Sequence, residues 1–248
     1  MVVLGIDTSS TDLSVCVSAD NAPLSIINRY VRNSHAEHIT QAVKLALELG
    51  GADVGDVSRV AVSVGPGSFT GLRIGLSFVK GFCLMTERKV LPLSSLMVLA
   101  HAVSYHRHKT SCRQERKIFT ALDARQGRVH WGSFVFGNNT GDSGVSEKAT
   151  LQRLTDDCLA PPGGLLDALS PDDILVTDTM GYPRSTVFAA FDGKARIVSA
   201  EKSALSRGLS CAALAFGSIN DESLWLPARE IAPNYLQMSA AEEKITCN

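Results

Sequence analysis

Two aspartates stand at the points where an apolar, strand-like run gives way to a polar turn. Asp7 follows the run at residues 2–6 and leads into Thr8 and Ser9, and Asp123 follows the run at residues 118–122. Carboxylates at the carboxyl ends of core strands lie where open α/β sheets bind ligands. Two such turns facing one another would hold a Mg-bound nucleotide, as in actin, sugar kinases and chaperone ATPases. The candidate nucleotide-binding residues are therefore Asp7, Thr8, Ser9 and Asp123.

The alternative reading of both aspartates is local. Asp side chains commonly accept backbone N–H groups two residues further on and so stabilise a turn without any ligand. The first turn offers hydroxyl groups but neither glycine nor lysine, whereas phosphate cradles rely on glycine-exposed amides. Tight nucleotide binding by this chain alone is therefore not favoured.

The most distinctive segment is GPGSFTGLRIG at residues 65–75. A glycine-rich loop that opens a helix is a sound anion site because free N–H groups and the helix dipole point outward. The spacing and lysine of a P-loop are absent. Gly71 and Gly75 lie one turn apart on the face that carries Phe78 and Phe82. Each glycine costs a helix about 1 kcal/mol, so the pair indicates close approach by another backbone, either a partner helix or this chain's own sheet.

No residue pattern predicts catalysis or a metal. His35 and His38 are three residues apart and lack a third ligand of suitable type nearby. There is no G-x-S-x-G elbow, no marked acid/base couple and no C-x-x-C pair among the six cysteines. We therefore expect no catalytic residue, no metal and reduced thiols.

Composition limits the classes of partner. Lys and Arg total 24 against 25 Asp and Glu, giving a formal net charge of -1, so the basic excess of a strong nucleic-acid binder is missing. If a nucleic acid is bound, a partner supplies much of the binding charge. The N-terminus lacks the pattern of a signal peptide, and no apolar run is long enough for a membrane span. We expect a cytoplasmic protein that does not contact a membrane.

The elements that position these residues alternate between strand and helix patterns. Residues 34–49 form the clearest helix, with Ser34 and Glu37 as a capping box and two glycines as the stop signal. Helices are also predicted at residues 68–85, 96–105, 151–159 and 204–216, and a basic exposed loop at 106–117. The strand, aspartate, turn and returning strand occur once in each half, which predicts one lobe at residues 1–105 and a second, divergent lobe with a C-terminal tail at 106–248.

Several segments in this order resemble the bacterial TsaB (YeaZ) family. The match lies in LGIDTS at residues 4–9, His35 in its helix, GPGSFTGLRIG, and Ser94-Ser95-Leu96. It continues more patchily with DARQGRV at 123–129, Trp131 and PNYL at 233–236.

The resemblance implies a two-lobed α/β fold of the actin/hexokinase-like (ASKHA) class with ribonuclease H-like lobes. It implies a non-catalytic subunit needed for threonylcarbamoyladenosine modification of the adenosine next to the tRNA anticodon. The implied partners are the transferase TsaD, which this chain would bind and activate, the ATPase TsaE, and tRNA through the complex. A homodimer would be unsurprising in isolation. The implied cofactors are none of its own, with ATP or ADP at the partner interface left open.

In that family the first two helices dock against the equivalent helices of TsaD, so the resemblance assigns the partner surface to residues 34–49 and 68–85. The expectation is that Gly71→Leu or Gly75→Leu blocks docking and leaves the monomer folded. An ATP-dependent small-molecule kinase or ATPase of the same fold is the alternative function, and a metalloprotease would require bound metal. The expected partner-binding residues are His35, Ile39, Val43, Gly71, Ile74, Gly75, Phe78 and Phe82.

Overall fold

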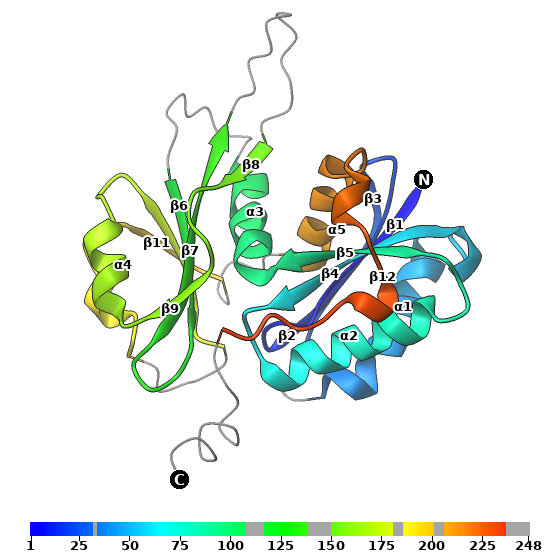
Figure 1. Ribbon diagram of the computed structural model, residues 1–248, viewed down its shortest axis with the longest axis horizontal. Helices are drawn as coiled ribbons and strands as arrows, with labels where there is room; N and C mark the ends of the chain where they lie inside the picture. Colours follow the sequence, from blue (N-terminus) through cyan, green and yellow to red (C-terminus); the bar gives the residue numbers. More distant parts are fainter. Residues whose placement is uncertain (32–33, 108–116, 138–149, 181–185, 201–205, 237–248) are drawn as a thin grey trace, which may run out of the picture. The chain divides into compact units, whose positions relative to one another are not determined.

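The computed structural model describes residues 1–31, 34–107, 117–137, 150–180, 186–200 and 206–236. The chain divides into two compact units (Figure 1). The first comprises Met1–Val98 and the segment from Ser206 onward, and the second comprises Leu99–Leu205.

This division corrects the predicted boundaries. The first boundary falls at residue 98 rather than 105, and the chain after Ser206 rejoins the first unit instead of completing the second. The physical reason is apolar packing: Cys211, Ala212 and Ala215 of the returning helix are buried against strand residues of the first unit.

The first unit is built on a six-stranded mixed sheet with the order β12-β5-β4-β1-β2-β3. Strands β1 and β2 are antiparallel, as are β2 and β3, whereas β4 and β5 run parallel to β1. The strand bounds are β1 Val2–Asp7, β2 Asp12–Ala19, β3 Ala22–Tyr30, β4 Val57–Gly65, β5 Lys89–Ser94 and β12 Leu226–Pro227.

Helices cover both faces of this sheet (Figure 1). Helices α1 (His35–Leu49) and α2 (Phe69–Cys83) pack on one face around buried side chains such as Leu4, Val15 and Val62. Helix α5 (Arg207–Gly217) packs on the other. Short 3-10 turns lie at Val54–Asp56, Glu222–Leu224 and Ala228–Glu230.

The second unit repeats the strand order of the first. Its sheet runs β11-β10-β6-β7-β8, with β6 and β7 antiparallel and β10 and β11 parallel to β6. β9 pairs with β7 off this path. With β9 left out, the sheet read from β8 has the order third, second, first, fourth, fifth, which is also the order β3-β2-β1-β4-β5 of the first unit. The predicted duplication is therefore confirmed at the level of topology.

The remaining elements of the chain belong to this second unit or lead into it. Helix α3 begins before Leu99 and continues past it. The bounds are α3 Ser95–Arg107, β6 Lys117–Asp123, β7 Val129–Gly137, β8 Thr150–Arg153, β9 Cys158–Ala160, α4 Pro162–Ala168, β10 Ile174–Asp178, a 3-10 turn at Ala189–Phe191 and β11 Arg196–Ser199.

The helix predicted at residues 151–159 is wrong. The chain there forms β8 and β9, both of which pair antiparallel with β7. Backbone hydrogen bonds from the neighbouring strand override the local helical spacing, which is a weak prior for so short a segment. Most of the predicted basic loop at 106–117 lies outside the described residues.

The helix predicted at 34–49 is confirmed, but its capping box is not. Ser34 precedes α1 without a side-chain cap and donates its hydroxyl to the carbonyl of Val31. Helix α2 gains a true cap instead, because the Ser68 hydroxyl accepts the Gly71 N–H at 3.2 Å.

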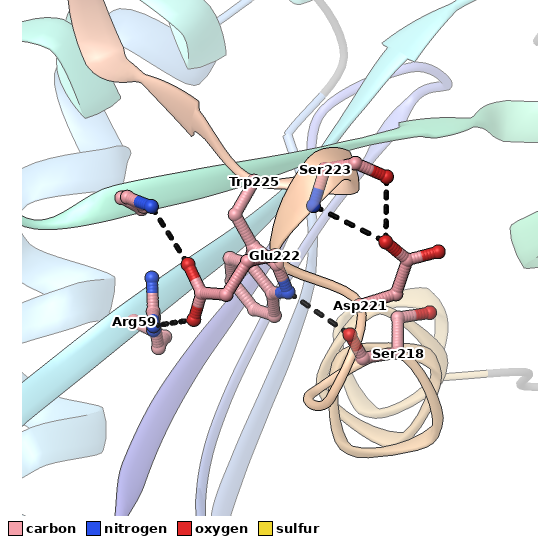
Figure 2. Close-up of polar contacts among 7 residues, drawn as sticks. Arg59, Ser218, Asp221, Glu222, Ser223 and Trp225 are labelled. Atoms are coloured by element: carbon pink, nitrogen blue, oxygen red, sulfur yellow. Dashed lines mark hydrogen bonds and ion pairs between the residues drawn. The ribbon is translucent and has the colours of Figure 1, made fainter.

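The returning segment is fastened to the sheet by one acidic residue and one tryptophan. Figure 2 shows Glu222 bound to Arg59 of β4, and its other oxygen lies 2.7 Å from Lys89 Nζ of β5. The Arg59 guanidinium lies 4.9 Å from the centre of the buried Trp225 ring, whose Nε1 donates to the Ser218 carbonyl at 3.0 Å. One carboxylate thus joins two strands to the segment that precedes β12.

Glu222→Gln should lower stability at neutral pH, and the difference from the wild-type protein should close as the solution is acidified. The hydrogen bond from Lys89, with the charges of Lys89 and Arg59, lowers the pKa of Glu222 below its ordinary value of 4.5. A lowered folded-state pKa gives stabilisation that is complete above the unfolded value and is lost as pH falls through the folded one. Urea midpoints measured from pH 7 downward test this.

Glu48→Gln, at an exposed position on α1, is the control. The difference between its urea midpoint and that of the wild type should change little with pH. A gap for Glu222→Gln that persists unchanged in acid would contradict the assignment.

Candidate functional site

The carboxylate of Asp7 accepts hydrogen bonds from residues of its own unit. Oδ1 accepts the Ser9 N–H at 3.2 Å and the Ser9 hydroxyl at 3.0 Å, and Oδ2 accepts the hydroxyl of Ser63 from the neighbouring strand β4. Asp7, Thr8 and Ser9 are all 0% exposed. Three of the four residues proposed from sequence to contact a nucleotide, Asp7, Thr8 and Ser9, thus lie together in the first unit, where the Asp7 carboxylate bonds to Ser9 and Ser63.

The N-terminus of α2 is turned onto this same β1–β2 turn. The Ser68 N–H donates to the Ser9 carbonyl at 2.7 Å. A free N–H at a helix N-terminus attracts anions, and here a carbonyl oxygen of the chain takes one of them. The glycine-rich loop therefore holds the turn.

The two α2 glycines make this approach sterically feasible. A Cβ atom on Gly71 would lie 2.1 Å from the Thr8 carbonyl oxygen, and one on Gly75 would lie 2.2 Å from Thr8 Oγ1. Real Cβ atoms do not come so close to other heavy atoms. Of the two readings given by sequence, packing within the chain's own sheet is the correct one for both positions.

The partner-surface expectation is corrected for the three α1 residues as well. His35, Ile39 and Val43 are each 3% exposed. Ile39 and Val43 belong to the core cluster between α1, α2 and the sheet. Burial lowers the pKa of His35, opposed by backbone hydrogen bonds with Asp12 and Ser10, so this imidazole favours the neutral form inside the unit. These side chains hold α1 on the sheet and are not presented outward.

Ile74, Phe78 and Phe82 are different. They pack at the edge of the same core cluster and keep part of their surface exposed. The Phe78 and Phe82 rings are stacked with centroids 5.9 Å apart. We name Ile74, Phe78 and Phe82 the α2 stripe; these are the members of the predicted partner surface that remain accessible.

The C-terminal segment clamps the start of α2. Its Ile231 is buried in the core, and the Asn234 N–H donates to the Val64 carbonyl at 2.7 Å. The Tyr235 ring stacks on Phe69 at 4.9 Å, and the Tyr235 hydroxyl accepts from Arg73 Nε at 2.8 Å. The segment PNYL was noted only as part of the family resemblance. No pattern in the sequence predicted that it contacts residues 64–73, some 160 positions earlier in the chain.

Arg207 and Ser63 are further residues that the sequence did not indicate. Arg207 begins α5, is 3% exposed, and has Nη1 3.5 Å from the Ser9 hydroxyl. Ser63 also lies 3.7 Å from the Cys211 sulfur, and burial strongly raises the pKa of that thiol. The turn after β1 is therefore supported by polar groups from β4 and α5.

The second aspartate turn lies in the second unit. Asp123 Oδ1 accepts the Arg125 N–H at 2.7 Å, and Arg125, Gln126 and Gly127 have positive φ. Asp178, at the end of β10, accepts the Met180 N–H in the same way. Asp123 stabilises its turn as the local reading expected, and its role toward a nucleotide stays a prediction.

Within the described ranges, no group of three or more His, Cys, Asp or Glu side chains is placed to hold a metal ion. Among the helices formed by those residues, none is long and apolar enough to cross a membrane.

Two units with one strand order, each opening on a strand that ends at an aspartate-capped turn, define an α/β protein of the actin/hexokinase-like (ASKHA) class with ribonuclease H-like lobes. The solved structure of YeaZ from Pseudomonas aeruginosa has this fold: it covers 95% of this chain and 100% of its own, with a TM-score of 0.71 and 22% identity.

Sequence comparison gives the family. The family model described as TsaD, tRNA N6-adenosine threonylcarbamoyltransferase, matches residues 26–180. The tRNA threonylcarbamoyladenosine biosynthesis protein TsaB of Escherichia coli (strain K12) is 30% identical over 155 residues, or 61% of this chain and 63% of the relative. The Bacillus subtilis (strain 168) TsaB is 29% identical over 138 residues, or 56% and 57%.

The chain therefore belongs to this threonylcarbamoyltransferase-related family, in its TsaB (YeaZ) branch. The matched region spans less than two thirds of the length of these curated relatives.

Gly75→Leu should destabilise the isolated chain rather than act on docking alone, contrary to the expectation from sequence. A branched side chain at this position must displace Thr8, and overpacking of this kind costs about 1–3 kcal/mol. Chemical denaturation of the purified protein measures the loss.

Gly81→Ala is the matched control on the same helix, because nothing lies within 4 Å of a Cβ placed there. It should leave stability unchanged or raise it by up to about 1 kcal/mol. Equal unfolding midpoints for the two variants would rule out the Thr8 contact as the reason for glycine.

Proposed function

We propose that this chain is the non-catalytic subunit of a tRNA threonylcarbamoyladenosine-forming complex and acts by binding and activating a TsaD-type transferase. Family membership supplies the pathway. The observation that carries the non-catalytic role is the closed β1–β2 turn, in which Asp7, Thr8 and Ser9 are fully buried and the amide of Ser68 is bound to the chain's own Ser9 carbonyl.

The α2 stripe supports the binding half of the proposal. Partly exposed aromatic side chains at helical spacing are what a partner helix packs against, and aromatic residues are enriched where interface energy concentrates. Phe78 and Phe82 lie one turn apart on α2, and the adjacent Val79 and Cys83 are buried in the core cluster and fix the helix to the sheet. The stripe is therefore presented by a rigid element.

Further parts of this proposal are that a TsaE-type ATPase joins the complex, that tRNA is held mainly by the partners, and that the complex works in the cytoplasm. Nucleotide bound at the partner interface, and a homodimer of the isolated chain, are compatible with it.

The deciding experiment combines the purified chain with its cognate TsaD-type transferase and measures threonylcarbamoyl transfer to tRNA. Transfer should depend on adding the chain, and the chain alone should show neither transfer nor ATP turnover. Efficient turnover by the isolated chain would instead support the kinase or ATPase reading.

Phe78→Gln combined with Phe82→Gln should weaken complex formation by roughly tenfold or more, because truncated interface aromatics commonly cost at least about 1 kcal/mol each. Calorimetric titration against the transferase measures this, and the unfolding midpoint reports any loss of core packing by the same rings.

Ser77→Gln provides the control, since Ser77 is exposed on the same helix and immediately precedes Phe78. It should bind and activate as the wild type does. Wild-type affinity in the folded double variant would exclude the α2 stripe as the docking surface.

A further inference from the structure

A groove lies at the C-terminal end of α2, away from the closed turn at its N-terminal end. Its volume is about 660 Å³, within the range of roughly 300–1,000 Å³ that is common for ligand sites. Three segments of the first unit form its walls: the end of α2, the connection to β5 with the first residue of that strand, and the returning segment from the last residue of β12 onward. The lining residues are Lys80, Cys83, Leu84, Thr86, Glu87, Arg88, Lys89, Pro227, Ala228 and Arg229.

The groove is positively charged although the chain as a whole is not. Four of its side chains are cationic and one is a carboxylate, so the local balance of 4 − 1 is +3, against a formal -1 for the full sequence. Of the cations, Lys89 is paired with Glu222 at 2.7 Å, and Arg229 with Glu230 at 3.6 Å.

The other two cations, Lys80 and Arg88, form no ion pair within the described part of the chain. Arg88 is held in place by carbonyl groups: Nε donates to Val57 at 2.6 Å and Nη2 donates to Val54 at 2.5 Å. A guanidinium fixed by neutral acceptors keeps its positive charge uncompensated. The groove therefore favours an anionic occupant.

The rim of the groove is apolar and unusually exposed. Leu84 is 77% exposed, and the adjoining Met85 is 91% exposed. Neighbouring exposed apolar side chains mark interaction surfaces, and methionine is enriched at protein interfaces. A small anion in the groove would leave both side chains in water, whereas a polypeptide would cover them.

An RNA strand fits these features less well. Single-stranded nucleic acid is bound by aromatic platforms beside a basic path. The aromatic ring nearest in sequence, Phe82, is stacked on Phe78 and has the Arg88 guanidinium 5.1 Å from its centre. None of the described residues that line the groove itself is aromatic, so the groove offers no ring on which a base could stack.

We propose that this groove binds an acidic segment of a partner protein, with carboxylates on the Lys80, Arg88 and Arg229 side chains and an apolar side chain against Leu84 and Met85. The proposal does not require the transferase-docking role of the α2 stripe and survives if that role fails.

The test uses the full chain and two fluorescent, capped peptides of equal length, one of glutamate and leucine and one of glutamate and serine. Binding is followed by fluorescence anisotropy at physiological salt. Lys80→Gln combined with Arg229→Gln should lower the affinity for the leucine-containing peptide by roughly tenfold, the effect expected of two surface charge pairs. Lys194→Gln, exposed in the second unit, should not change it.

The contribution of the apolar rim to peptide binding is tested separately. Leu84→Gln should lower the affinity for the leucine-containing peptide and leave the affinity for the serine-containing peptide unchanged. Equal affinity for both peptides, or no loss in the double charge variant, would overturn the proposal. Tighter binding of an oligouridylate that displaces the peptide would show that the groove is a phosphate-backbone site instead.

Discussion

The structure of the first unit depends on how closely α2 approaches the turn between β1 and β2. Thr8 occupies the space that side chains at positions 71 and 75 would need, and the Ser9 carbonyl takes an amide hydrogen at the start of the helix. This contact joins the sheet to α2, buries the polar turn and satisfies a helix end that would otherwise seek a ligand. Because the contact fixes which face of α2 points inward, it also fixes which face keeps Ile74, Phe78 and Phe82 accessible.

The returning C-terminal segment reinforces that contact from two directions. Glu222 ties the segment to β4 and β5, and Asn234 and Tyr235 then secure the loop and first turn of α2. Helix α5 covers the opposite face of the sheet and places Arg207 near Ser9. The turn after β1 is thus held by β4, α2 and α5 together.

The buried turn after β1 and the accessible side chains of α2 result from the same packing contact. The Asp7 carboxylate and the N-terminal end of α2 are used in the packing of the first unit, and the same helix keeps part of its surface accessible. The α2 stripe is apolar and aromatic, whereas the groove at the end of the same helix is cationic with an apolar rim. These two surfaces differ in chemistry, so they select different partner features, and both are presented by a helix anchored through Leu76, Val79 and Cys83.

The sequence by itself determined the local patterns: the helices predicted at 34–49 and 68–85, the strand that ends at each aspartate, the repeat of this opening in each half, and the resemblance to the family. Each rests on short-range spacing or on residues that are adjacent in the chain. Tertiary structure alone decided that Gly71 and Gly75 face Thr8 and that His35, Ile39 and Val43 are buried. It also decided that residues 150–153 and 158–160 form strands and that the chain after Ser206 returns to the first unit. Those outcomes depend on contacts between positions tens to hundreds of residues apart, and spacing within one segment carries no information about what packs against it.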